Sequence, residues 1–327
     1  MATFNQPICL NSTTNTGTGS CSFERAPIKY VIAVPNAFTL AATTFGTLIN
    51  TLQTRAVSPD RNDRVYFLGA FTNSEPQVTE PTFETTGNGS KILVRKEIVN
   101  MRLEMKGATT CDHKAIASFR GLQKTHKFLF YQSNGLLWGQ GVNNSVDPNL
   151  LEMGGAKAQL VDVPIQAGAT YEAAPVSHLD INFLDMRALQ GNEVWFDCNG
   201  LDIEDTFDTY RVTSVKLAKS AVVGTTGVFK FTAASSCGAN LGIDYAAEID
   251  ETAFTAINVT TGAGLAITSA VANPATGEIT LTLTTPPVAG TKVRISLAST
   301  TILSGLGISY FESMNDNGTN YVEFTNI

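Results

Sequence analysis

The sequence predicts a mainly β protein with two β domains and one or two helices. Thr, Ser, Gly and Asn are abundant, and these residues favour strands and turns over helices. Short apolar segments with a period of two alternate with turn residues along most of the chain. Apolar residues recur at helical spacing in two segments, residues 36–53 and 110–121.

Length and charge limit the classes of function. The chain has 327 residues, which is enough for two domains with separate cores. Charged residues are 16% of the total, against about a quarter in typical soluble domains. We therefore expect neighbouring subunits to cover much of the surface. The net charge of -7 argues against a nucleic-acid-binding surface, which needs a basic stripe, but it does not exclude DNA that merely passes through an acidic channel, because like charges repel and prevent sticking.

Residues 1–26 are expected to form an N-terminal arm. Residues 11–20 are polar and show no apolar period, so they cannot build a core. Such an arm is either disordered or ordered by packing on a neighbouring subunit. The segment lacks the basic and apolar regions of a signal peptide.

The first domain, residues 27–206, opens with a strand and a helix. Residues 28–34 are apolar and β-branched, and Asn36 is expected to cap a helix that extends to residue 53. Its buried face contains Phe38, Ala41, Ala42, Phe45, Leu48, Ile49 and Leu52. Residues 30–54 carry no charge, but their polar content favours a strand and helix over a membrane span.

A second strand is predicted at residues 64–71, followed by a polar loop that contains Pro76. Residues 85–90 are a strong turn signal, and residues 91–106 alternate in hydrophobicity as a long strand. The alternation changes phase near Asn100, which indicates a bulge or a strand that bends between two sheets.

A short helix is predicted at residues 110–121, capped by Thr110 and stopped by Gly121. Its buried stripe consists of Ala115, Ile116, Phe119 and Leu122. A hairpin closed by Asn134-Gly135 follows. The strands expected in the rest of this domain are residues 128–131, 136–138, 157–164, 178–184 and 193–196.

The second domain, residues 207–327, has short, regularly spaced strands rich in Thr and Val. This pattern is typical of an immunoglobulin-like β sandwich. The strands are predicted at residues 212–216, 228–233, 256–260, 266–271, 278–283 and 292–297.

Candidate catalytic groups are sparse. Cys111-Asp112-His113 begins the second predicted helix, but adjacent side chains splay around a helix and cannot form a triad. A packed thiol is therefore favoured over a reactive one. The three histidines, which include His126 and His178, lie in different elements without metal-ligand spacing. No catalytic or cofactor-binding residue is assigned, and an enzyme is not expected.

The five cysteines are Cys9, Cys21, Cys111, Cys198 and Cys237. They are widely scattered and form no C-x-x-C pair, so a zinc site is not expected. Free thiols in a reducing cytosol are the expected state, with a Cys9–Cys21 pair as the alternative.

One acidic cluster separates the two domains. It consists of Asp202, Glu204, Asp205 and Asp208. The cluster lacks the glycine and the terminal glutamate of an EF-hand loop, so a solvated linker is favoured and a calcium site is the alternative.

The order of elements in residues 64–139 resembles that of bacteriophage tail tube proteins. A strand is followed by the glycine-rich loop Gly87-Asn88-Gly89 and by the long strand at residues 91–106. The helical segment DHKAIASF and a hairpin that ends in NGLLWG come next. The resemblance extends over roughly residues 28–200.

This resemblance implies a tail-tube-like β sandwich or barrel with a helix beside it. Six subunits would join their inner sheets into a ring, and arms and loops would lock stacked rings into a tube. The immunoglobulin-like domain would lie outside. The implied protein is part of the virion tail and is made in the host cytoplasm. Its partners are copies of itself and other tail proteins, and DNA passes through the lumen without specific binding. No cofactor and no membrane is implied.

Two other functions fit the same features. Another virion component, such as a head decoration, tail terminator or fibre-associated protein, would share the β architecture. A carbohydrate-binding protein would stack sugars on exposed aromatic side chains. The candidates for such stacking are Trp138, Trp195, Tyr310 and Tyr321.

Overall fold

The computed structural model is mainly β, with several antiparallel sheets and few helices, as the sequence predicts. It divides into unit 1, which consists of Met1–Arg55 and Asp60–Asp208, and unit 2, which consists of Ala56–Pro59 and Thr209–Ile327. The structure describes residues 26–40, 45–58, 60–79, 82–87, 89–95, 98–143, 151–166, 168, 174–183, 193–198, 213–220, 226–235, 237–308, 311–313 and 320–326. Residues 1–25 of the predicted arm lie outside these ranges.

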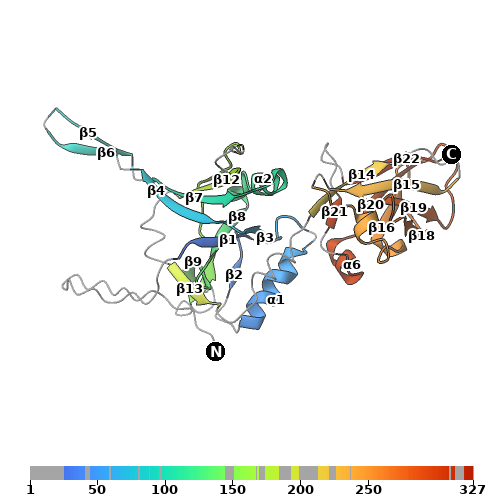
Figure 1. Ribbon diagram of the computed structural model, residues 1–327, viewed down its shortest axis with the longest axis horizontal. Coiled ribbons are helices and arrows are strands. Elements are labelled where there is room, and N and C mark those ends of the chain that lie inside the picture. Colours follow the sequence, from blue (N-terminus) through green and yellow to red (C-terminus); the bar gives the residue numbers. More distant parts are fainter. Residues whose placement is uncertain are drawn as a thin grey trace. The chain divides into compact units, whose positions relative to one another are not determined.

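Unit 1 contains a seven-stranded sheet, sheet A, with the order β2-β10-β9-β8-β1-β3 and with β13 also paired to β9 (Figure 1). Its strands are β1 (Ile28–Pro35), β2 (Thr39–Leu40), β3 (Tyr66–Gly69), β8 (His126–Gln132), β9 (Leu136–Asn143), β10 (Leu151–Gly154) and β13 (Glu193–Asp197). The predicted Asn-Gly turn between β8 and β9 is confirmed. The Gly135 N–H donates to the Gln132 carbonyl (3.0 Å), and Gly135 has a φ of 83°, which favours glycine.

Sheet B has four strands in the order β11-β12-β7-β4. They are β4 (Asn73–Thr79), β7 (Ile98–Lys106), β11 (Leu160–Asp162) and β12 (Val176–Phe183). The polar loop predicted around Pro76 is wrong, because β4 pairs with β7 along its whole length. Proline is tolerated there because β4 is an edge strand, which leaves one side of its backbone without ladder hydrogen bonds.

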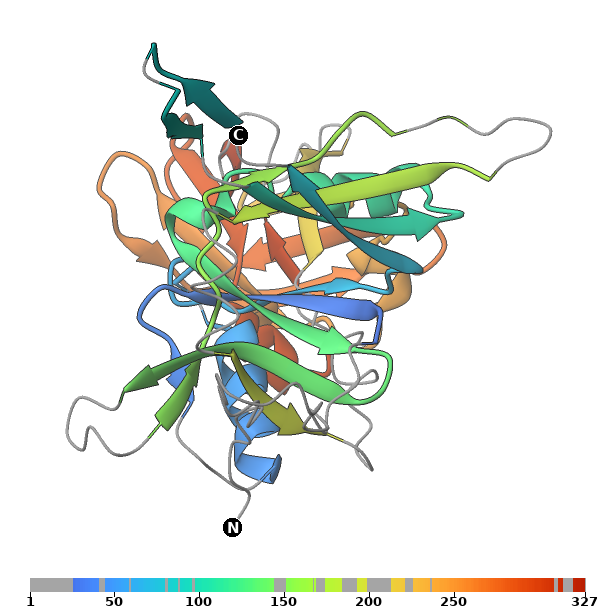
Figure 2. The same ribbon diagram turned by 90° about the vertical axis from the view of Figure 1, so that its left-hand side faces the viewer.

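A two-stranded ribbon continues from β4 and β7. It consists of β5 (Thr82–Thr85) and β6 (Lys91–Arg95), and Figures 1 and 2 show it projecting from the end of sheet B. The predicted turn is confirmed by the Thr86 N–H, which donates to the Ser90 carbonyl (2.8 Å). The long strand predicted at residues 91–106 is divided between the ribbon and sheet B. The break falls between Arg95 and Ile98, a few residues before the phase change in the sequence.

The first predicted helix is wrong in its N-terminal half. Asn36 lies in a turn after β1, and the next residues form β2, which pairs with β10. Helix α1 spans Phe45–Ala56 and buries Leu48 and Leu52. Local periodicity cannot reveal the pairing of β2 with β10, because the two strands are remote in sequence.

Helix α2 (Thr110–Ala117) is followed by the 3-10 turn η1 (Leu122–Lys124). The predicted buried stripe is confirmed: Ile116 and Phe119 belong to the core of unit 1. Sheets A and B contribute facing residues to this core, which include Val31, Phe130 and Trp138 from sheet A and Leu103, Leu179 and Phe183 from sheet B. Sheets A and B and helix α2 thus enclose the core of unit 1.

Unit 2 contains two sheets around a second core. Their orders are β18-β19-β15-β14-β21, in which β14 and β21 are parallel, and β17-β16-β20-β22. The strands are β14 (Thr213–Lys219), β15 (Val228–Ala234), β16 (Phe254–Asn258), β17 (Gly264–Leu265), β18 (Ile267–Ala272), β19 (Glu278–Leu283), β20 (Lys292–Leu297), β21 (Phe311–Ser313) and β22 (Val322–Thr325). The helical segments are α5 (Leu241–Asp244), η2 (Glu251–Ala253) and α6 (Thr300–Gly305).

All six strands predicted for the second domain are present in unit 2; β19 and β20 have the predicted bounds, and the bounds of the other four differ by one to three residues. No sequence pattern predicts β17, β21, β22 or the helical segments. The immunoglobulin-like topology stays a prediction.

Candidate functional site

The three side chains of Cys111-Asp112-His113, at the start of α2, each interact with a different partner. Asp112 accepts hydrogen bonds from the N–H and the hydroxyl of Thr109 (both 2.8 Å), so Thr109 caps the helix instead of the predicted Thr110. His113 Nδ1 lies 3.2 Å from the buried Ser177 Oγ on β12. Cys111 is disulfide-bonded. The triplet therefore forms no nucleophile–base pair.

The expectation of free thiols is wrong for two cysteines. Cys111 and Cys237 are each disulfide-bonded, whereas Cys198 is a buried thiol. A disulfide requires two cysteines to lie close together in the folded chain, and the spacing of scattered cysteines in the sequence does not show which of them do. Cys9 and Cys21 lie outside the described residues.

The other two histidines lie in different surroundings. His126 is buried, and its Nε2 lies 3.0 Å from the Arg64 carbonyl, to which it donates. Burial lowers the pKa of His126, and the hydrogen bond to Arg64 partly offsets this effect. His178 Nδ1 lies 3.8 Å from a carboxylate oxygen of Glu104 on β7. Within the described part of the chain, no three metal-binding side chains lie together.

The acidic cluster of Asp202, Glu204, Asp205 and Asp208 lies outside the described residues. Its two interpretations, a solvated linker and a calcium site, stay predictions.

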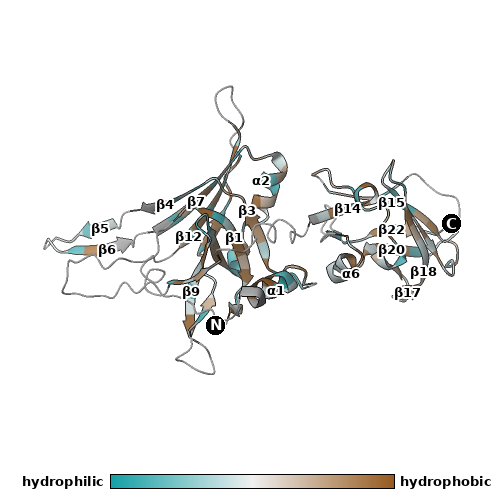
Figure 3. Cartoon of the chain, turned by 60° about the horizontal axis from the view of Figure 1, so that its bottom comes forward, coloured by the Kyte–Doolittle hydropathy of each residue, from teal (hydrophilic) through white to brown (hydrophobic). Residues whose placement is uncertain are grey.

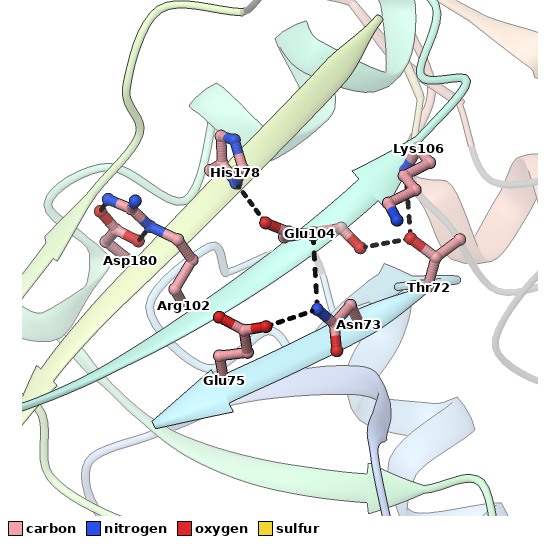
Figure 4. A network of polar contacts seen from close by, with 8 residues as sticks. All are labelled: Thr72, Asn73, Glu75, Arg102, Glu104, Lys106, His178 and Asp180. Carbon is pink, nitrogen blue, oxygen red and sulfur yellow. Dashed lines mark hydrogen bonds and ion pairs between the residues drawn. The ribbon is translucent and has the colours of Figure 1, made fainter. Parts of the chain in front are cut away.

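A ladder of polar side chains covers one face of sheet B (Figure 4). Directly paired residues of antiparallel strands share a face, and Arg102 on β7 is paired with Asp180 on β12 and with Glu75 on β4. Arg102 Nε and Nη2 donate to both carboxylate oxygens of Asp180, at 2.9 and 2.8 Å. This hydrogen bonding raises the pKa of Arg102 above its ordinary value, with smaller contributions from the charges of Asp180, Glu104 and Glu75.

The next rung of the ladder is centred on Glu104. It is paired with His178 on β12 and with Asn73 on β4. Asn73 Nδ2 bridges two carboxylates, because it lies 3.4 Å from Glu104 Oε2 and 3.1 Å from Glu75 Oε1. The opposite face of the same strands carries Leu103 and Leu179 into the core.

Carboxylates predominate over cations around the centre of this ladder. The central guanidinium is held by carboxylates, and Glu75, Glu104 and Asp180 outnumber the cations Arg102 and Lys106 among the residues drawn in Figure 4. Arg102 is thus already paired, with Glu75 and Glu104 beside it, and this arrangement disfavours phosphate binding at the Arg102 guanidinium.

Exposed apolar side chains mark two further places in unit 1. Phe83 and Ile92 on the β5–β6 ribbon are 53% and 56% exposed, and Figure 3 shows apolar residues in brown along the ribbon. Leu160 on β11 and Ile165 beyond it are 48% and 92% exposed. The sequence did not lead us to predict that these residues are exposed. A two-stranded ribbon cannot form a core of its own, so apolar residues in a short ribbon are a usable signal of exposure.

Two of the four aromatic residues considered for sugar stacking are buried. Trp138 and Trp195 are 5% and 3% exposed, with ring centroids 5.9 Å apart. The Tyr321 ring on unit 2 is covered by the Arg294 guanidinium at 4.3 Å, and Tyr310 lies outside the described residues. The two tryptophans are thus core residues, which removes them from a sugar-binding surface.

None of the helices in the described ranges has the length and apolar character that a membrane crossing requires. Comparison of the chain with protein-family models, with curated proteins and with solved structures finds no match.

Proposed function

We propose that the chain is a structural virion protein whose copies assemble into stacked rings that form a phage tail tube, a conduit for DNA. The observation that carries this proposal is the order of elements in unit 1. A strand (β3), the turn that contains Gly87 and Gly89, the strands β6 and β7, a helix (α2) and an Asn-Gly hairpin (β8–β9) occur in this order along the chain, with β4 and β5 between β3 and the turn. This is the order on which the resemblance to tail tube proteins rests.

Open sheet edges support an assembling protein. In the described part of the chain, β4 and β11 end sheet B. Free edges expose backbone donors and acceptors and invite pairing with another chain. A ring of copies removes such edges in the same way as a closed barrel does.

The polar ladder on sheet B supports passage of DNA over a wall that does not hold it. Arg102 is paired with Asp180, and carboxylates predominate around it. Phosphates bind proteins chiefly through unpaired lysine and arginine side chains. A lumen lined by such a face lets DNA slide.

Negative-stain electron microscopy of the purified protein over a range of concentrations tests the proposal. Six-fold rings or stacked tubes with a central hole of duplex width are expected. Monodisperse monomers or trimers at every concentration would contradict the tube and favour a head decoration, terminator or fibre-associated protein.

A further inference from the structure

The outer face of the sheet β17-β16-β20-β22 in unit 2 carries an exposed isoleucine beside an arginine. Ile257 on β16 is paired with Arg294 on β20, which is paired with Glu323 on β22. Directly paired residues of antiparallel strands share a face, and the next row, which includes Ile295 and Val322, points into the core. Ile257 is 41% exposed, and so is the Arg294 side chain.

Two neighbours orient the Arg294 guanidinium. Its Nε donates to Glu323 Oε2 (3.1 Å), and its central carbon lies 4.3 Å from the centre of the Tyr321 ring. In the described part of the chain, its two terminal nitrogens form no hydrogen bond. An arginine held in this way presents a pair of donors that matches the two oxygens of a carboxylate, and it loses little freedom on binding. The face therefore offers a preformed site for a carboxylate.

Cations outnumber carboxylates on this face. Lys292 Nζ lies 3.1 Å from Glu323 Oε1, so Glu323 is shared by two cations and an excess of positive charge remains. Gly264 on β17 is paired with Ile257, and no other part of the chain lies within 4 Å of the place that a Cβ at Gly264 would occupy. The surface beside Ile257 is therefore open to an apolar side chain of a partner. The name Arg294 face is used below for Ile257, Lys292, Arg294, Tyr321 and Glu323.

A second surface of unit 2 has the complementary character. Residues 231–291 contain no lysine or arginine. Within them Asp244, Glu248 and Glu251 are exposed, and Ile243 beside Asp244 is 45% exposed. Among the residues that the structure describes, none forms an ion pair with these three carboxylates. The name acidic edge is used below for Ile243, Asp244, Glu248 and Glu251.

The backbone of the acidic edge is held in place on the sandwich. The Asn240 N–H donates to Asp244 Oδ2 (2.8 Å), and Asn240 Oδ1 accepts from the Gly242 N–H (3.1 Å). Ile249 and Ala253, from the same segment, belong to the core of unit 2. Both surfaces thus present their charges from ordered backbone, which limits the entropy that a contact between them would cost.

The acidic edge fits the Arg294 face of another copy. Each surface joins one exposed isoleucine to uncompensated charge, and the charges are opposite in sign. Within one chain, the described residues form no ion pair between the two surfaces. The carboxylates of sheet B are less available, because Asp180 is bonded to Arg102 and Asn73 bridges Glu75 and Glu104.

We propose that the Arg294 face of one copy binds the acidic edge of a second copy, so that unit 2 of one copy is joined to unit 2 of the next. The Arg294 guanidinium binds a carboxylate of the acidic edge, and Ile257 packs against Ile243. The contact joins two different surfaces, which makes it heterologous and able to repeat from copy to copy. It goes beyond the proposed tail tube, because the observation that carries the tube lies in unit 1.

Carbodiimide cross-linking tests the contact without altering the chain. Unlabelled and 15N-labelled proteins are mixed when dilute, concentrated together and treated with a carbodiimide, which joins a lysine to a carboxylate in direct contact. Mass spectrometry of the peptides is expected to find Lys292 linked to Glu248 or Glu251, including links that join a labelled to an unlabelled chain. The link of Lys292 to Glu323 within one chain is the internal control for reactivity.

Two outcomes of this experiment overturn the proposal. Links from Lys292 to the acidic edge that never join a labelled to an unlabelled chain would place the contact within one molecule. Absence of these links at every concentration, while the control link to Glu323 forms, would show that the two surfaces do not meet.

A substitution at Arg294 provides the second test. Arg294→Gln is expected to lower the yield of the link between copies about tenfold or more, because a carboxylate of the acidic edge loses its charged partner. Lys230→Gln is the matched control, since Lys230 also pairs with a glutamate, Glu278, at 2.9 Å on the other sheet of unit 2. Circular dichroism and thermal melting confirm that each variant folds. A wild-type yield in Arg294→Gln, or an equal loss in the control, overturns the proposal.

The two proposals fail in different ways. Rings or tubes that form while the link between Lys292 and the acidic edge is absent leave the tail tube function intact and refute the contact. A link between copies in protein that forms no ring or tube keeps the contact and refutes the tube. Protein that stays monomeric at every concentration refutes both.

Discussion

Arg102 on β7 and Asp180 on β12 form a bidentate ion pair, in which both carboxylate oxygens accept hydrogen bonds from the guanidinium at 2.9 and 2.8 Å. The Asp180 side chain is 10% exposed and that of Arg102 is 33% exposed. Removal of one partner from such a half-buried pair leaves the other charge without its hydrogen bonds. The pair therefore stabilises the pairing of β7 with β12 on the polar face of sheet B.

We expect Asp180→Asn to lower the free energy of unfolding by about 1–3 kcal/mol, because Arg102 loses a charged acceptor. Urea unfolding followed by circular dichroism measures this loss. Asp162→Asn is the matched control, because Asp162 pairs with Arg120 at 3.3 Å but both side chains are more than half exposed. The control is expected to change stability by less than about 1 kcal/mol. Equal effects of the two substitutions would contradict the role assigned to burial.

His126 makes stability depend on pH. Its pKa is lowered from the ordinary value because burial disfavours the charged ring. As pH falls below about 6.5, the unfolded chain takes up a proton before the folded one does, so the contribution of His126 to stability is lost toward the lower, folded pKa. We expect His126→Gln to weaken the decline of unfolding free energy between about pH 7.5 and about pH 5.

The matched control for this prediction is His113→Gln. The His113 ring is only partly buried, in contrast to the His126 ring. Urea titrations at several pH values give the slope of unfolding free energy against pH for the wild type, His126→Gln and His113→Gln. A His126→Gln slope that equals the wild-type slope would show that other groups set the acid sensitivity.

Local patterns predict the strands of this fold better than its pairings. Residues 292–297 alternate between exposed and buried side chains, and β20 has the predicted bounds. The pairing of β2 with β10 depends on residues more than one hundred positions apart, so the spacing after Asn36 appears helical although residues 39–40 form a strand. The strand at Pro76 is possible only because β4 lies at an edge, and edge position is a property of the sheet and not of the segment.

The candidate surfaces were less accessible to sequence reasoning. The ladder of Arg102, Asp180 and Glu75 exists because register aligns three strands, and each residue alone is an ordinary polar residue of a strand. Exposure of Ile165 depends on how Gln166 and Arg120 tie its segment. An isoleucine is usually buried, so only the three-dimensional arrangement distinguishes Ile165 from a core residue.

The disulfides set the number of reactive thiols. Cys111 and Cys237 are each disulfide-bonded. Five cysteines minus these two leaves at most three that react with a thiol reagent when the protein is unfolded without reductant. Reduction is expected to lower the free energy of unfolding by about 2–4 kcal/mol. Thiol titration in denaturant and thermal melting with and without reductant measure both effects. The double variant Cys111→Ser/Cys237→Ser is expected to show no response to reductant, and Cys198→Ala is the control that keeps the response. Five reactive thiols before reduction would contradict the bonded state.

The two tryptophans report on the core of unit 1. The rings of Trp138 and Phe130 are stacked with centroids 4.4 Å apart, and Trp195 is paired with Trp138 across β13 and β9. We expect Trp138→Ala to lower the free energy of unfolding by about 3–5 kcal/mol, because it removes a large buried ring and leaves a cavity. Tyr321→Ala is the control, since its ring is partly exposed and loses mainly a cation–π contact of about 0.5–1 kcal/mol with Arg294.

Fluorescence separates a core role for these tryptophans from a sugar-stacking role. Buried indoles emit at short wavelength and shift to long wavelength only on unfolding, so titration with mono- and oligosaccharides is expected to leave the emission unchanged. Saturable quenching by a sugar in the folded protein, lost in Trp138→Ala under conditions where that variant is still folded, would place an indole at a binding surface and would restore carbohydrate recognition as a function of this chain.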